Sequence, residues 1–229
     1  MLGDAYAYTV DALWGKWVRW LLLFVSCIIF PLILGYTMEI YRGKRPAPEP
    51  DDWAKLFIDG LKLFVAGLIY AIPVIIVFAV FGGFALLSLI SSAAVSGNPD
   101  IVASNPELLA GSLALFLVGL LIAVVLGIVI SLVSTIGMVR LARMDSIGEA
   151  FNFSAILATI GRIGWSNYIV ALIVLWIVGV AFGIVTSILG AIPFLGWLLV
   201  LLVVPAIVVF QARYITRIYE SAGPDATIR

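Results

Sequence analysis

The fold of this chain is decided by residues 163–212, which read IGWSNYIVALIVLWIVGVAFGIVTSILGAIPFLGWLLVLLVVPAIVVFQA. These fifty consecutive residues contain no Asp, Glu, Lys or Arg. Three further charge-free stretches occur, at 20–38, 63–99 and 108–139. A charged side chain at the centre of a bilayer costs about 2.5–3.5 kcal/mol on insertion scales, whereas water accepts one anywhere. The absence of charge therefore indicates that lipid, not water, surrounds most of the chain.

The composition of the 229 residues points to the same class. Hydrophobic residues make up 64% of the chain and the mean hydropathy is +1.21, against roughly 45–50% apolar residues in soluble domains. Backbone groups in lipid must be bonded internally, and the long runs of Leu, Ile, Val and Ala do not alternate as barrel strands do. We expect an all-α, polytopic transmembrane helical bundle, with residues 1–229 forming a single integral membrane domain.

Five membrane spans are predicted, because each crossing of a hydrocarbon core of about 30 Å takes about 20 apolar residues. Gly190, Pro193 and Gly196 divide the longest stretch into a hairpin of two spans. A cluster of turn-forming residues at 96–100 ends the second span. The predicted spans are 20–40, 63–92, 108–139, 165–189 and 196–214, and 220–229 is a tail.

Three further segments, 1–19, 51–62 and 146–161, have one apolar face and are predicted to lie as amphipathic helices in the membrane interface. Asp51 is the expected cap of the second segment, and the residues from Ser146 to Glu149 form a capping-box pattern that opens the third. The apolar faces are formed by Val10, Leu13, Trp14, Trp17 and Leu21 in the first segment, by Trp53, Leu56, Phe57 and Leu61 in the second, and by Phe151 and Leu157 in the third.

The basic residues set the predicted orientation. Eleven of the thirteen Lys and Arg residues lie between the first and second spans, between the third and fourth, or after the fifth. The loops at 97–107 and 191–194 contain none. The positive-inside rule therefore places the basic loops and the C-terminus in the cytoplasm. Five crossings then place the N-terminus outside.

Lys16 and Arg19 disagree with that placement, because they would lie on the outer side. Two alternatives follow for residues 20–40. The segment crosses the membrane as a helix kinked at Pro31, or it dips in and returns as a re-entrant hairpin on the cytoplasmic side. The N-terminus has no basic run ahead of its apolar stretch, so we expect no cleaved signal peptide.

One part of the sequence carries a family resemblance. The segment 51–62, which begins Asp51-Asp52-Trp53 and leads into an apolar span, follows the pair Gly35-Tyr36 and a basic run that ends at Arg45. In these features the chain resembles the archaeal and bacterial multi-pass membrane proteins grouped as domain-of-unknown-function family 4013. The resemblance covers residues 17–219. It implies an all-helical membrane fold, and it brings neither an established activity nor functional residues.

Few residues of the chain are suited to catalysis. The sequence has no His, its single Cys27 lies in an apolar stretch, and no acidic residue lies within any of the four charge-free stretches. Metal sites of the His/Cys type and most acid–base pairs therefore lack their residues. We expect a protein that is not an enzyme and has no catalytic, metal or cofactor-binding residues. The net charge of zero gives no basic field for nucleic acid.

The charged residues of the second interfacial segment allow two readings. Asp51 and Asp52 are expected to cap a helix and to balance its dipole, and the alternative for them and Asp59 is a cation or basic-partner site. The nearby basic residues mark topology and, as a further hypothesis, hold anionic lipid headgroups at about 1 kcal/mol each. These basic residues are Arg42, Lys44, Arg45, Lys55 and Lys62.

Small residues follow one another at four-residue spacing inside two spans. Such ladders let helix backbones approach closely, either within the chain or at the face of a homo-oligomer. They are Gly119, Ala123, Gly127, Ser131 and Thr135 in the third span, and Gly179, Gly183 and Ser187 in the fourth.

The function expected from the sequence is that of a structural, lipid-interacting or complex-forming component of the cell membrane. Its expected partners are membrane lipids, with a second copy of the chain or another membrane protein as the alternative. The other functional class is a channel or permease for a small solute. Such a protein has a water-filled cavity at mid-membrane, which Tyr70, Ser131, Thr135 or Thr186 would line here.

Overall fold

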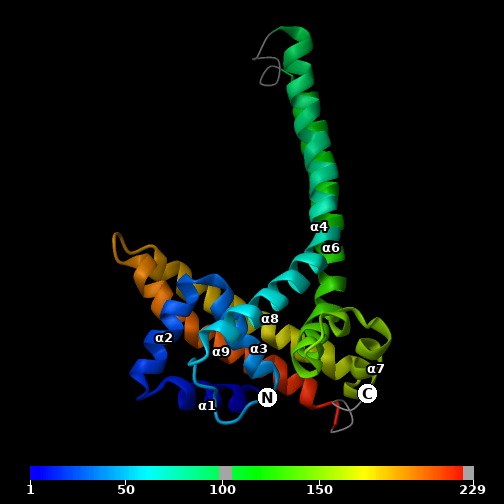
Figure 1. Ribbon diagram of the computed structural model, residues 1–229. Helices are drawn as coiled ribbons and strands as arrows, with labels where there is room; N and C mark the ends of the chain where they lie inside the picture. Colours follow the sequence, from blue (N-terminus) through cyan, green and yellow to red (C-terminus); the bar gives the residue numbers. More distant parts are fainter. Residues whose placement is uncertain (98–104, 224–229) are drawn as a thin grey trace. The chain divides into compact units, whose positions relative to one another are not determined.

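The computed structural model describes residues 1–97 and 105–223 (Figure 1). Within these residues the fold is all-α, as predicted, with one short 3-10 helix and no β-strand. The helices are α1 (Leu2–Leu13), α2 (Trp17–Ile28), α3 (Phe30–Tyr41), α4 (Trp53–Ser96), α6 (Pro106–Met144), the 3-10 helix η1 (Ile147–Phe151), α7 (Phe153–Ile163), α8 (Trp165–Gly190) and α9 (Gly196–Glu220). The chain divides into unit 1, residues 1–67 and 133–229, and unit 2, residues 68–132, each of which is described by itself.

Four helices, α4, α6, α8 and α9, are long and apolar enough to cross a membrane. They contain the predicted spans 63–92, 108–139, 165–189 and 196–214. Their length and composition indicate an integral multi-pass membrane protein. The turn predicted at 96–100 falls mostly outside the described residues, as does the predicted tail 220–229 from residue 224 onward.

The predicted first span, 20–40, is replaced by two short helices, α2 and α3, which pack against one another. Each has 12 residues and is therefore about 18 Å long, well short of a hydrocarbon core of about 30 Å. The helix is interrupted at Ile29, whose φ and ψ are −92° and 83°. Pro31 explains the break, because within a continuous helix it would remove a backbone hydrogen bond and clash with the carbonyl four residues earlier, whereas in the first turn of α3 its missing N–H costs nothing. The described residues thus contain four helices that could span a membrane instead of the five predicted, and whether 20–40 forms a re-entrant hairpin stays a prediction.

The predicted interfacial helix 51–62 is continuous with the span that follows it, since α4 runs unbroken from Trp53 to Ser96. The apolar face predicted to point outward to lipid is observed in part. Leu56 is buried in the protein, whereas Phe57 and Leu61 are 44% and 45% exposed. The buried face instead includes Asp59, which has its ion-pair partners there. The exposed Phe57 and Leu61 fit the outward face that was predicted, and only Leu56 is turned into the protein.

The other two predicted interfacial segments are each divided. Residues 1–19 form α1 and the start of α2, separated by Gly15 at a φ of 73°, a value that glycine tolerates better than other residues. Residues 146–161 form η1 and most of α7. Ser146 makes no side-chain cap, and Asn152 caps α7 instead by accepting from the Ala155 N–H. The predicted capping box is therefore corrected to a short 3-10 turn followed by an Asn cap.

Unit 1 is organised around α9, which packs against α1, α2, α3 and α8. Its tightest backbone contact is the crossing of α3 with the first turns of α4. A Cβ added at Gly35 would lie 1.8 Å from the Leu56 carbonyl oxygen, and one added at Gly60 would lie 1.7 Å from the Pro31 carbonyl oxygen. Only glycine permits this approach, which explains why the first residue of the pair Gly35-Tyr36 is a glycine.

Unit 2 consists of the facing parts of α4 and α6, which lie side by side as an antiparallel pair (Figure 1). The pair is in contact at Gly119, where an added Cβ would lie 2.2 Å from the Phe81 Cβ. The Ser88 and Ser112 hydroxyls also share a hydrogen bond of 2.7 Å between the helices. At Gly127, another member of the predicted ladder, no atom lies within 4 Å of an added Cβ. The ladder is therefore used for packing over only part of its length.

Candidate functional site

The charged residues of unit 1 gather in clusters, and the first surrounds Glu39. This Glu39 cluster consists of Glu39, Arg42, Lys44, Lys55, Asp59, Lys62 and Asp145. The side chains of Glu39 and Asp59 are each only 4% exposed. Arg42 bridges them, since its Nη1 donates to Glu39 Oε1 at 2.7 Å and to Asp59 Oδ2 at 2.5 Å. Lys44 and Lys55 approach the Glu39 carboxylate at 2.5 and 2.7 Å.

Two carboxylates of the Glu39 cluster, those of Glu39 and Asp145, are stabilised in their charged form. Burial favours neutral Glu39, but the hydrogen bonds from Lys44 and Lys55 outweigh it and hold the pKa of Glu39 below its ordinary value. The hydrogen bond from Lys62 does the same to the pKa of Asp145. The basic residues considered for lipid headgroups are therefore already bonded to carboxylates, and headgroup binding by them stays a prediction.

The three aspartates of the segment 51–62 have separate roles. Asp52, rather than the predicted Asp51, caps α4 by accepting from the Lys55 N–H at 3.0 Å. Asp51 accepts from the Asp52 N–H at 2.9 Å. Asp59 belongs to the Glu39 cluster. Among the described residues, no three His, Cys, Asp or Glu side chains are grouped as a metal site would require.

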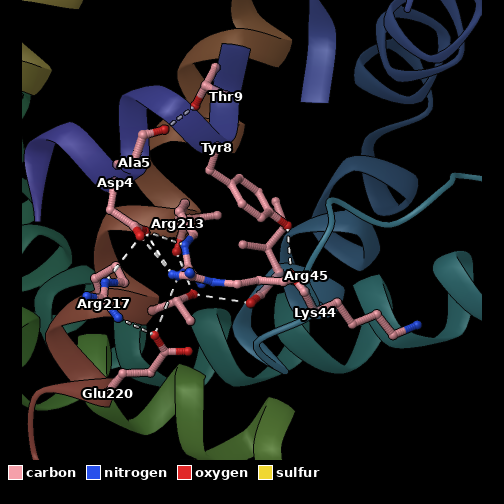
Figure 2. A network of polar contacts seen from close by, with 12 residues as sticks. Asp4, Ala5, Tyr8, Thr9, Lys44, Arg45, Arg213, Arg217 and Glu220 are labelled. Carbon is pink, nitrogen blue, oxygen red and sulfur yellow. Dashed lines mark hydrogen bonds and ion pairs between the residues drawn. The ribbon is translucent and has the colours of Figure 1, made fainter. Parts of the chain in front are cut away.

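A second cluster joins the first helix of the chain to its last (Figure 2). This arginine cluster consists of Asp4, Arg45, Arg143, Arg213, Arg217 and Glu220. Asp4 accepts from Arg45 Nη2 and from Arg213 Nε, each at 2.8 Å. Glu220 accepts from Arg143 Nη2 at 3.0 Å and from Arg217 Nη1 at 3.1 Å. Four guanidinium groups thus share two carboxylates, which leaves two surplus positive charges among the described members.

Arg213 is the buried centre of the arginine cluster. Its side chain is 0% exposed, and its guanidinium carbon lies 5.1 Å from the centre of the Tyr8 ring, a favourable cation–π geometry. Within the described part of the chain, Nη1 and Nη2 have no hydrogen-bond partner. Nη2 only approaches Glu220 Oε2, at 3.6 Å. An unmet buried donor costs about 1–3 kcal/mol, and more when charged.

The elements that place these residues are α9 and α1. Arg213, Arg217 and Glu220 are spaced by four and three residues, so they share one face of α9. Helix α1 packs against α9 through its buried Ala5, Tyr8 and Ala12, and it presents Asp4 from its first turn. The beginning of α1 and the end of α9 therefore meet at the same place in the molecule.

Arg19, which disagreed with the five-span topology, forms a separate buried ion pair. Its side chain is 6% exposed, its Nε donates to Glu49 at 3.0 Å, and its Nη1 donates to the Ala12 carbonyl at 3.2 Å. The hydrogen bond from Arg19 holds the pKa of Glu49 below its ordinary value. Because Glu49 belongs to the basic loop after α3, Arg19 lies on the same side as that loop.

The arginine cluster escaped sequence reasoning almost completely. From the sequence, Arg143, Arg213 and Arg217 are only markers of topology, Arg45 is also a candidate for anionic headgroups, and Asp4 has no assigned role. The spacing of Arg213, Arg217 and Glu220 on one helix face was the available signal. The contribution of Asp4 had no signal, because it comes from 209 residues away.

The hydroxyls considered for a transport pathway are bonded within the protein. Ser131 donates to the Ile128 carbonyl at 2.7 Å, and Thr186 donates to the Phe182 carbonyl at 3.0 Å, both within their own helices. Thr135 shares a side-chain hydrogen bond with Tyr168. Tyr70 is 9% exposed. These hydroxyls mostly serve helix packing.

The fold and its charged clusters define an all-α multi-pass membrane protein with no strand in the described residues and four candidate spans. The family profile described as "Protein of unknown function (DUF4013)" matches residues 20–191. The chain belongs to that family, as its resemblance in the segment 51–62 predicted. No curated protein and no solved structure matches the chain.

Proposed function

We propose that the protein is a non-enzymatic, structural and lipid-interacting component of the cell membrane, which anchors itself in the interface through its short N-terminal helices. The observation that carries this proposal is the outward face of α2. Trp17, Val18 and Leu21 are 71%, 74% and 61% exposed, while Arg19 and Leu23 on the opposite face are buried. Water does not favour such an exposed apolar face, whereas the boundary between headgroups and acyl chains does.

The tryptophans support the interfacial placement of α2. Trp14 is 77% exposed just before the helix, and the Trp17 and Trp20 rings stack with centroids 5.9 Å apart. Trp20 also donates its indole N–H to the Leu202 carbonyl of α9 at 2.9 Å. Tryptophan concentrates at the level of lipid headgroups, where its ring is apolar and its N–H finds a partner. In this proposal α2 and α3 form a re-entrant hairpin.

The topology that follows has four crossings and both ends in the cytoplasm. The ion pairs of Asp4 with Arg213 and Arg217 support an even number of crossings, since they join α1 to the end of α9. The cytoplasmic assignment rests on the positive-inside rule applied to the basic loops. Arg19 and its partner Glu49 fit this arrangement without the conflict that five spans created.

The alternative of a channel or permease receives less support. The hydroxyls that a transport pathway would use are bonded to backbone carbonyls or to one another. The proposal favours a component that works through lipid or through a partner, with a second copy of the chain as one candidate partner.

Cysteine labelling in intact cells tests the topology. In a Cys27→Ala background, Gly3→Cys and Ser221→Cys place single thiols near the two ends, at exposed positions. We expect a membrane-impermeant maleimide to label neither until the cells are opened. Labelling of Gly3→Cys alone from outside would restore the five-span topology and contradict the re-entrant hairpin.

Native mass spectrometry of the gently solubilised protein tests the lipid interaction. We expect retained lipid or a bound membrane partner. A clean monomer free of lipid, obtained under conditions that preserve the fold, would count against the proposal.

A further inference from the structure

The arginine cluster carries an inference that goes beyond membrane anchoring and does not depend on it. We propose that this cluster binds a phosphate group of the monoester kind, supplied by a lipid headgroup or by a soluble phosphate. Arg213, Arg217 and Arg45 form the cationic side of the site. The carboxylate of Asp4 lies in this site and competes with the phosphate for the guanidinium groups of these arginines.

The first reason is charge. Among the described residues, the arginine cluster has four cations and two carboxylates, and hence two positive charges in surplus. A phosphate monoester carries about −1.5 to −2 at neutral pH. One such group therefore balances the cluster, which a singly charged diester or a carboxylate does not.

The second reason is the state of Arg213. The two terminal nitrogens of its guanidinium have no hydrogen-bond partner in the described part of the chain, although its side chain is 0% exposed. Arginine presents parallel N–H donors that match two oxygens of one phosphate. Arg217 Nε is also buried and makes no hydrogen bond there, although it lies 3.5 Å from Asp4 Oδ1 as an ion pair. Asp4 and Glu220 therefore leave guanidinium nitrogens of two neighbouring arginines without hydrogen bonds, and the oxygens of a phosphate group could accept from them.

The third reason is the way Asp4 is held. Its carboxylate lies within 3.5 Å of the guanidinium nitrogens of three arginines, Arg45, Arg213 and Arg217. Three guanidinium groups around one oxyanion are the arrangement expected for phosphate recognition. Figure 2 shows the labelled Asp4 side chain pointing at these arginines. The rim is open, because Arg45 and Arg217 are 50% and 38% exposed and Asp4 is 27% exposed.

A surface hollow on the same elements suits an amphiphilic ligand. Its volume is about 460 Å³, and its walls include Ser166, Asn167, Val170, Val174, Tyr214 and Ser221. Arg217 lies three residues after Tyr214 and four before Ser221, so these three residues share a face of α9. A lipid phosphate at Arg217 would have an apolar wall and polar hydroxyls close by, whereas an inorganic phosphate would use the arginines alone.

The test measures phosphate binding to the purified full-length protein. Inorganic phosphate is titrated by calorimetry at constant ionic strength, because screening alone changes surface electrostatics. In parallel, the melting temperature is measured in nanodiscs of phosphatidylcholine with and without phosphatidic acid. Arg217→Gln removes a partly exposed donor, and Lys16→Gln is the matched control, since Lys16 is 40% exposed and forms an ion pair with Asp11 at 3.5 Å, away from the arginine cluster.

We expect Arg217→Gln to weaken binding at least tenfold and Lys16→Gln to change it less than twofold. Asp4→Asn removes the competing charge, so it should tighten phosphate binding by about fivefold to tenfold and make the melting temperature depend more strongly on phosphate. Because Arg213→Gln removes a buried charge and can unfold the protein, Arg217→Gln and Asp4→Asn carry the test.

The two probes separate the sources of the phosphate. Stabilisation by phosphatidic acid without binding of inorganic phosphate assigns the site to a lipid headgroup, and calorimetric binding of inorganic phosphate without an effect of phosphatidic acid assigns it to a soluble phosphate. The proposal is overturned if neither probe binds, or if Arg217→Gln and Asp4→Asn bind like the wild type. Equal losses in Arg217→Gln and Lys16→Gln would also overturn it.

Discussion

Units 1 and 2 are both built from apolar helices, but they are held together by different means. Of the thirteen basic and thirteen acidic residues, only Asp100 and Glu107 belong to unit 2. Unit 1 combines the buried Glu39 and arginine clusters with glycines that bring backbones into direct contact. Unit 2 has a helix pair joined by Gly119 and by one hydroxyl pair.

The difference shows how a membrane protein obtains a unique structure where the hydrophobic effect gives little direction. Lipid is as apolar as Leu or Ile, so burying such side chains between helices gains little. In unit 1, ion pairs and close backbone crossings fix how the helices pack, because each of these interactions is satisfied in only one arrangement of the helices. Unit 2 presents apolar side chains outward, and its two helices have no ion pair between them among the described residues.

Among the variants that compare the two units, Glu39→Gln is expected to lower the free energy of unfolding most. The change leaves Arg42, Lys44 and Lys55 without their shared carboxylate, and removing one partner of a buried ion pair costs about 3–5 kcal/mol. Unfolding in detergent, followed by circular dichroism, measures the loss. Asp145→Asn is the control, because Asp145 is 61% exposed and exposed pairs contribute about 0–1 kcal/mol. Equal losses in the two variants would show that burial does not strengthen the cluster.

The same carboxylate predicts a dependence of stability on pH. The pKa of Glu39 is lowered in the folded protein, so its contribution is complete above the pKa of an unfolded glutamate and is lost as the pH falls through the lower, folded value. We expect wild-type stability to fall in that acidic window and to fall less in Glu39→Gln. Identical acid profiles of the two proteins would mean that other carboxylates govern the acid response.

The next largest effect is expected from Gly35→Ala. The new Cβ would lie 1.8 Å from the Leu56 carbonyl oxygen, so α3 and α4 must separate, at a cost of about 3 kcal/mol. Gly83→Ala in unit 2 is the matched control, because no atom lies within 4 Å of its added Cβ. That control should be neutral or stabilising by up to about 1 kcal/mol through helix propensity. If Gly35→Ala and Gly83→Ala have the same melting temperature, the close contact between α3 and α4 is disproved.

The smallest effect is expected in unit 2 from Ser112→Ala. The change removes the hydrogen bond of 2.7 Å to Ser88, and such bonds between membrane helices contribute about 0.6 kcal/mol on average. Ser91→Ala removes a bond within one helix only and should have no measurable effect. A loss above 2 kcal/mol for Ser112→Ala would mean that polar contacts specify unit 2 as they do unit 1.

Sequence reasoning worked where a property belongs to a single helix. The positions of α6, α8 and α9 follow from charge-free length, and the family resemblance follows from the segment 51–62. At 20–40 the sequence left two alternatives open, a helix kinked at Pro31 and a re-entrant hairpin, because a proline is compatible with both. Sequence reasoning assigned Leu56 to lipid, because a single helix does not reveal which of its apolar residues meets a glycine on another helix.

The sequence by itself determined that lipid surrounds most of the chain and that the fold is helical. In lipid, each charged side chain and each unbonded backbone group costs free energy, and this holds for every segment separately. The family followed from the segment 51–62. Only the tertiary structure decided how the charges are used. Asp4 meets Arg213 and Arg217, and Glu39 meets Lys55, through contacts between distant helices. Ion pairs depend on distance in space, and spacing along the chain does not determine which charges will be brought within reach.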